Sequence, residues 1–153
     1  MKQGSTLFLK SVIYSLGLVA LGVCVIIGGV SISGNAGIYL PILIGLLITA
    51  IPFFISLYQG LQLLNYIDRN TAFSDQSVKA IQNIKYCAFT ISTLYAAGMP
   101  YAIYVADKVD SPVAVIDGLF WIFAFAVVAV FSAVLEKLLQ KAIDIKSEND
   151  LTV

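Results

Sequence analysis

The sequence predicts an all-α integral membrane protein: a four-helix bundle of two antiparallel helical hairpins, with both termini in the cytoplasm. Three observations predict this fold. Of the 153 residues, 59% are hydrophobic and only 12% are charged, about half the charge of a soluble domain. The apolar residues are gathered in four runs, each long enough to cross a bilayer as a helix. The longest polar segment between the termini, residues 66–87, lies at the centre and separates these runs into two pairs.

The first pair of runs forms a tight hairpin. Its first span, residues 11–30, is longer than the apolar region of a cleaved signal peptide, so we expect it to be retained. Residues 31–37 are rich in Gly and Ser and reverse the chain. The second span covers residues 38–61. Pro52 lies in its interior and is expected to kink the helix, because proline removes a backbone hydrogen bond.

The central segment, residues 66–87, is predicted to be cytoplasmic and amphipathic. Ser74 is a good helix cap, and Asp75 after it suits the positive end of the helix dipole. Apolar residues then recur on one face of the predicted helix, with lysines and amides on the others. We therefore expect a short helix at the inner membrane surface that leads into the third span.

The second pair of runs forms the other hairpin. The third span, residues 86–106, contains Gly-Met-Pro at 98–100, which is expected to bend or locally unwind it. The fourth span, residues 113–135, starts after a Ser-Pro pair typical of a helix N-terminus. Beyond it we expect a cytoplasmic amphipathic tail, residues 136–153. Nothing outside the apolar runs is long enough to fold separately, so residues 1–153 form a single membrane domain.

The distribution of positive charge predicts the orientation. Of the nine Lys and Arg residues, only Lys108 falls on the side opposite the termini and the central segment. Positive residues accumulate on the cytoplasmic side of membrane proteins. We therefore expect a multi-pass protein of the bacterial cytoplasmic membrane with both termini inside.

The composition argues against an enzyme. The chain has no histidine and only two cysteines, which removes the commonest general base and most transition-metal sites. No nucleophile and base are grouped in the sequence, so we expect no catalytic residue, no cofactor and no metal ion. Equal numbers of acidic and basic residues give no support for direct nucleic-acid binding.

Asp117 is the only ionisable residue inside a predicted span, and such residues are candidates for a functional role. It lies only about 7 Å below the start of its helix at 1.5 Å per residue. One interpretation is therefore a solvated carboxylate, or one paired locally with Lys108 or Ser111. The other is a proton, cation or substrate site. Asp107 and Asp110 could join Asp117 around a hard cation, although their spacing matches no established loop.

A second polar feature lies near the inner end of the second span. Gln59 and Gln62 fall on one stripe of the helix, and we group them with Asp117 as the candidate intramembrane polar site. A solvated helix end would explain this stripe. The alternative is a hydrogen-bonding face for another helix or a partner.

Two cytoplasmic segments carry a family resemblance. The segment FSDQSVKAIQNIKYC, from Phe73, and the fourth-span exit FSAVLEKLLQKAIDIKSENDLTV resemble the YoaS-like family of small four-span bacterial membrane proteins. That family is a domain of unknown function, so the resemblance supplies no catalytic residue. Its members are often encoded beside a small helix-turn-helix regulator. The resemblance thus implies a cytoplasmic DNA-binding partner.

Two hypotheses follow. The first is a regulatory or interaction protein that docks a cytoplasmic partner through 66–87 and 136–153, where the polar surface is concentrated. The second is a small oligomeric transporter or channel, because proline-interrupted spans and an intramembrane carboxylate recur at membrane binding sites. A four-span monomer has little room for a pathway, so this second hypothesis requires a homo-oligomer. The candidate docking residues are Phe73, Ser74, Lys79, Gln82, Lys85, Lys137, Lys141, Glu148, Asp150 and Leu151.

Overall fold

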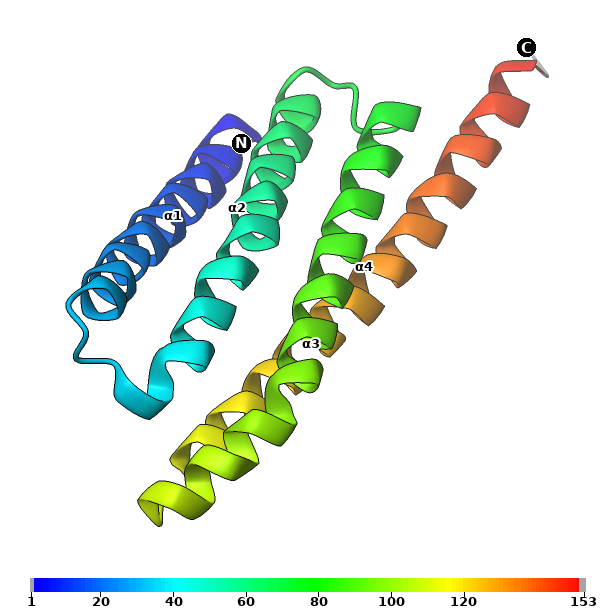
Figure 1. Ribbon diagram of the computed structural model, residues 1–153. Helices are drawn as coiled ribbons and strands as arrows, with labels where there is room; N and C mark the ends of the chain where they lie inside the picture. Colours follow the sequence, from blue (N-terminus) through cyan, green and yellow to red (C-terminus); the bar gives the residue numbers. More distant parts are fainter. Residues whose placement is uncertain (1, 152–153) are drawn as a thin grey trace.

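The computed structural model describes residues 2–151, and the described chain is helical almost throughout. Four long helices follow one another, with one short 3-10 helix before the second (Figure 1). Their bounds are α1 Lys2–Ile32, η1 Gly37–Tyr39, α2 Leu40–Asp68, α3 Asp75–Val109 and α4 Val113–Leu151. The predicted all-α fold is confirmed. The last two residues of the predicted tail lie outside the described residues.

The helices are arranged as two antiparallel hairpins in chain order. Each helix packs mainly against the helix that precedes or follows it in the sequence (Figure 1). Both termini and the connection at 69–74 lie at one end, which we call the inner end because we predict it to be cytoplasmic. The turns at 33–36 and 110–112 lie at the opposite, outer end.

The turns contain residues that tolerate left-handed backbone. Gly34 and Gly37 have φ of 76° and 53° in the first outer turn, a conformation that glycine adopts without steric cost. Asp110 ends α3 with a φ of 50°. At the inner end, the Ser74 hydroxyl accepts a hydrogen bond from the backbone N–H of Ser77 at 3.4 Å. The predicted start of α3 is therefore confirmed with its cap.

Helix α3 is the centre of the packing. It packs against both α2 and α4, and it carries most of the buried side chains. Val105 and Ile91 on α3 are 0% and 1% exposed. In the described residues, three helices are long and apolar enough to cross a membrane, and these are α1, α2 and α4. The third predicted span lies in α3, whose more polar sequence is covered by its two neighbours, and its passage through the bilayer stays a prediction.

Large apolar side chains cover the outside of the molecule. Leu18 on α1 is 73% exposed, and Phe123 and Val130 on α4 are 69% and 65% exposed. Monomeric soluble proteins rarely expose continuous apolar surface on this scale. These side chains are placed to face lipid.

One sequence-based expectation about the backbone is wrong. Helix α3 is continuous through residues 98–100 and does not unwind at Pro100. Proline removes only one helical hydrogen bond, and α2 and α4 hold α3 on two sides. Helix α2 likewise continues through Pro52, where the expected kink stays a prediction.

Candidate functional site

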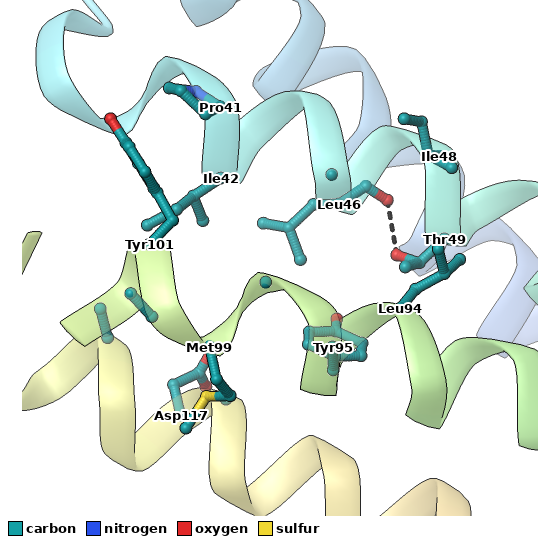
Figure 2. Close-up of a pocket in the computed structure, with 15 residues that line it drawn as sticks. Pro41, Ile42, Leu46, Ile48, Thr49, Leu94, Tyr95, Met99, Tyr101 and Asp117 are labelled. Carbon is teal, nitrogen blue, oxygen red and sulfur yellow. Dashed lines mark hydrogen bonds between the residues drawn. The ribbon is translucent and has the colours of Figure 1, made fainter. Parts of the chain in front are cut away.

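A cavity of about 400 Å³ lies among α2, α3 and α4, toward the outer end (Figure 2). Its lining is mainly apolar, with Ile42 and Leu46 on α2 facing Leu94 on α3. The volume falls in the range of small-molecule sites, which combine apolar walls with a few polar groups. The cavity is therefore large enough for a ligand and has its polar groups at identifiable places.

Tyr101 closes the outer end of the cavity. Its hydroxyl donates a hydrogen bond to the backbone carbonyl of Ile38 at 2.7 Å. Its ring lies beside that of Tyr104, with centroids 5.7 Å apart. The hydrogen bond joins α3 to the 3-10 turn before α2, so this end of the cavity is fixed by a contact between the two hairpins.

An aromatic cluster supports the inner end of the cavity. The Tyr95 ring, which lines the cavity, stacks on Phe125 of α4 with centroids 6.4 Å apart. Phe125 in turn stacks on Trp121 at 5.9 Å and meets the edge of Phe53 on α2 at 6.5 Å. Rings from three helices thus form one packed group. Beside it, the Thr49 hydroxyl donates to the Leu46 carbonyl at 2.8 Å (Figure 2).

Asp117, on the first turns of α4, provides the acidic group of the cavity. Its side chain lies beside Met99 (Figure 2). Within residues 2–151 no hydrogen bond or ion pair joins its carboxylate to Lys108 or Ser111, so these expected partners do not hold it. The described residues also contain no group of three acidic, histidine or cysteine side chains able to hold a metal ion. The suggested cation site with the two neighbouring aspartates is therefore wrong.

Three glycines decide the space around Asp117. Gly45 on α2 and Gly98 on α3 line the cavity, and a Cβ atom built on either would meet nothing within 4 Å. Both glycines therefore enlarge the cavity. By contrast, a Cβ on Gly118 of α4 would lie 2.8 Å from the Met99 sulfur, so Gly118 provides the room that the Met99 side chain occupies.

The two glutamines of the expected intramembrane site lie elsewhere. Gln59 and Gln62 are on the inner part of α2 and do not line the cavity around Asp117. The Gln62 amide instead donates to the Tyr58 hydroxyl on the same helix at 2.9 Å. The structure therefore does not bring the three predicted residues together.

An ion pair joins the inner ends of α1 and α2. The Lys10 ammonium lies 2.5 Å from one carboxylate oxygen of Asp68, and the Thr6 hydroxyl donates to the other at 2.5 Å. The hydrogen bonds from Lys10 and Thr6 lower the pKa of the Asp68 carboxyl. Because this group lies beyond the predicted span, it anchors the first hairpin at the membrane surface.

A second ion pair joins the inner ends of α3 and α4. The Lys85 ammonium lies 2.7 Å from Glu136, whose other oxygen accepts a hydrogen bond from the Gln82 amide at 2.7 Å. These bonds lower the pKa of Glu136, and the hydrogen bond to Glu136 raises the pKa of Lys85. Gln82 and Lys85, both expected to dock a partner, are thus engaged inside the protein.

Sequence reasoning missed both acidic partners, although a signal was available. Asp68 and Lys10 lie at similar distances along the chain from the first outer turn. Glu136 and Lys85 do so from the second. In an antiparallel hairpin, such positions meet at the same depth, so opposite charges placed there predict a pair.

The remaining docking residues surround the inner end of α4. Phe73 is 55% exposed and lines a shallow pocket of about 360 Å³ together with Ala142, Ile145, Lys146 and Asn149 of α4. We call these five residues the inner groove. Ser74 is taken up by the cap of α3. The others lie exposed on the start of α3 or along the tail of α4: Lys79, Lys137, Lys141, Glu148, Asp150 and Leu151.

Comparison with known proteins places the chain in a family. The model of the family described as "Protein of unknown function (DUF2975)" matches residues 30–153. The chain belongs to this family. A curated relative, "Uncharacterized membrane protein YoaS" of Bacillus subtilis (strain 168), is 49% identical over 160 aligned positions, covering 100% of each chain. The resemblance to the YoaS-like family is confirmed. No solved structure matches the chain.

The DUF2975 match has a structural boundary. It begins at residue 30, near the end of α1, and therefore includes the helices that build the cavity and both sides of the inner groove. Helix α1 lies almost wholly outside the family model, although the Bacillus relative covers it. The family and its relative indicate a multi-pass membrane protein and assign no activity.

Proposed function

We propose that this DUF2975 protein is a regulatory or interaction protein of the bacterial cytoplasmic membrane that docks a soluble cytoplasmic partner. One observation carries the proposal. The start of α3 and the tail of α4, predicted separately as docking segments, lie together around the inner groove. A single partner can therefore contact both segments at once.

The inner groove offers contacts of two kinds. Phe73 and Ile145 are 55% and 60% exposed, and the charged side chains of Lys146 and Glu148 lie on the same stretch of α4. Interfaces of soluble partners combine a buried apolar or aromatic anchor with a polar rim. The groove matches that pattern on a small scale, which suits a partner helix with one apolar face.

The family resemblance suggests the first partner to test, a small helix-turn-helix regulator. Holding such a protein at the membrane would keep it from DNA, so the membrane protein itself needs no affinity for nucleic acid. No catalytic group enters this proposal, in keeping with our expectation that the protein is not an enzyme.

Site-specific crosslinking in native membranes tests the proposal. A photo-reactive phenylalanine analogue at Phe73 should capture the regulator, and the purified regulator should then bind the full chain in nanodiscs. Deleting residues 145–153 should abolish this binding while insertion is unchanged. The same analogue at Tyr39, which is 44% exposed at the outer end, is the matched control. Equal capture from both positions, or full binding without the tail, would refute the docking role.

A small oligomeric transporter or channel is the second candidate. The cavity lined by Asp117 favours it, because transport sites combine an intramembrane ionisable group with a space open to substrate. Flux measured in proteoliposomes should then fall for Asp117→Asn and persist for Asp107→Asn. Unchanged flux in the first variant would remove the reason for this candidate.

A further inference from the structure

We propose that the cavity among α2, α3 and α4 binds a lipophilic cation, an apolar molecule that carries one ammonium group, with Asp117 as its counter-ion. This site is separate from the inner groove and lies near the opposite end of the helices. The proposal concerns binding alone, so it does not depend on whether the protein transports the ligand or docks a partner.

The shape of the cavity sets the apolar part of the ligand. The walls from Ile42, Leu46 and Leu94 are hydrocarbon, and the volume of about 400 Å³ lies toward the small end of ligand sites. The cavity faces the lipid phase on its open side, since the surrounding helices expose apolar side chains such as Ile44 at 46%. An apolar molecule can therefore enter from the bilayer without crossing a polar surface.

The charges around the cavity set the sign of the polar group. Asp117 is the one ionisable acid or base among its lining residues. Lys108 is the nearest basic residue in sequence, and its ammonium lies 5.7 Å from the Tyr104 ring centroid rather than against Asp117. A carboxylate at this depth is costly without a counter-charge. A bound ammonium would supply that charge, whereas an anionic ligand would add repulsion.

Two tyrosines strengthen the preference for a cation. Tyr95 and Tyr101 line the cavity from α3, at its inner and outer ends. The face of an aromatic ring attracts an ammonium group, most strongly where water is excluded. A neutral lipid acyl chain could fill the same walls, but it would leave both the rings and Asp117 without a positive partner.

The chain contains a built-in reporter for this site. It has only two methionines, Met1 and Met99, and Met99 lines the cavity beside Asp117. With 13C-labelled methionine methyl groups in nanodiscs, the Met99 signal reports occupancy of the cavity directly. The probes are 2-(1-naphthyl)ethylammonium, 2-(1-naphthyl)ethanol and 3-(1-naphthyl)propionate, which share one ring system and differ in charge.

The expected result is a saturable shift of the Met99 signal by the ammonium probe. We expect the alcohol to bind at least about tenfold more weakly and the carboxylate to give no shift, as for a desolvated charge pair. Asp117→Asn should remove the preference for the ammonium probe over the alcohol. Asp107→Asn, which removes the same charge from an exposed site outside the cavity, should keep the preference.

A second pair of variants tests the cavity without touching its charge. Gly45→Leu places a side chain in the empty space, where no atom lies within 4 Å of the new Cβ, and should block both the ammonium probe and the alcohol. Gly22→Leu on α1 makes the same change away from the cavity and should bind normally. Both changes replace glycine in a helix by a better helix former, so neither is expected to prevent folding.

Three outcomes would overturn the proposal. The first is no Met99 shift with the ammonium probe at any concentration that the nanodiscs tolerate. The second is equal binding of all three probes by the wild-type chain, which would indicate simple partitioning of naphthyl groups. The third is an ammonium preference that survives Asp117→Asn. None of these outcomes bears on the docking of a partner at the inner groove.

Discussion

Truncation of the buried Ile91 should destabilise the helix packing, whereas truncation of a larger exposed residue on the same helix should not. Ile91 is 1% exposed at the centre of α3, and Phe89, two residues earlier, is 65% exposed. In a soluble protein both side chains would gain by leaving water. In a bilayer the surrounding lipid is as apolar as the protein interior, so only the packing contacts distinguish the two positions.

The size of the effect follows from the cavity that Ile91→Ala leaves. In soluble proteins such a change costs the transfer of the lost methyl groups plus about 24 cal/mol per Å³ of residual cavity. In lipid the transfer part largely vanishes. A residual cavity of roughly 40–80 Å³ then predicts a loss of about 1–2 kcal/mol, below the 2–5 kcal/mol typical of soluble cores. Phe89→Ala should cost less than about 0.5 kcal/mol, because lipid chains refill the space.

Unfolding in mixed micelles by titration with sodium dodecyl sulfate measures both values. The single tryptophan, Trp121, is a suitable signal because it stacks on Phe125 in the aromatic cluster of α4. A loss of similar size in the Ile91 and Phe89 variants would refute the reasoning, since it would mean that α3 is not covered on one side and open to lipid on the other.

Two further predictions concern single contacts. The Glu136 pKa is lowered below 4.5 by its bonds to Lys85 and Gln82, so its stabilising effect is present above pH 4.5 and is lost as the pH falls through the lowered value. The difference in unfolding midpoint between wild type and Glu136→Gln should therefore shrink between pH 7 and pH 3, and a constant difference would contradict it. Gly118→Ala would place a Cβ 2.8 Å from the Met99 sulfur, and should turn that flexible side chain into the cavity with a changed Met99 methyl signal. An unchanged signal would show that the helices separate instead.

The elements of the fold could be predicted because their signals are local. Apolar runs placed the helices, and the Gly- and Ser-rich residues 31–37 placed the first turn. Ser74 and the apolar face that follows placed the start of α3. The unwinding expected at Pro100 was wrong because a local signal was read without the packing that counters it: α2 and α4 support α3 on two sides.

The candidate site could be predicted only in part, because its geometry depends on contacts between helices. Asp117 was identified from its charge alone, but the grouping with Gln59 and Gln62 ignored their depth along α2. The cavity depends on Gly45 and Gly98 facing each other's helices without filling the space, and the sequence does not contain that register. Likewise, Lys85 was read as a surface residue because its partner, Glu136, is distant in sequence.

The placement of the two ion pairs has a consequence for the order of biosynthesis. Lys10–Asp68 lies within the first hairpin and Lys85–Glu136 lies within the second. Each hairpin thus neutralises its own charges as soon as its second helix has emerged from the insertion machinery. The first can be complete before α3 begins at Asp75. The two halves then meet in the bilayer as finished units, along the seam where α2 and α3 enclose the cavity.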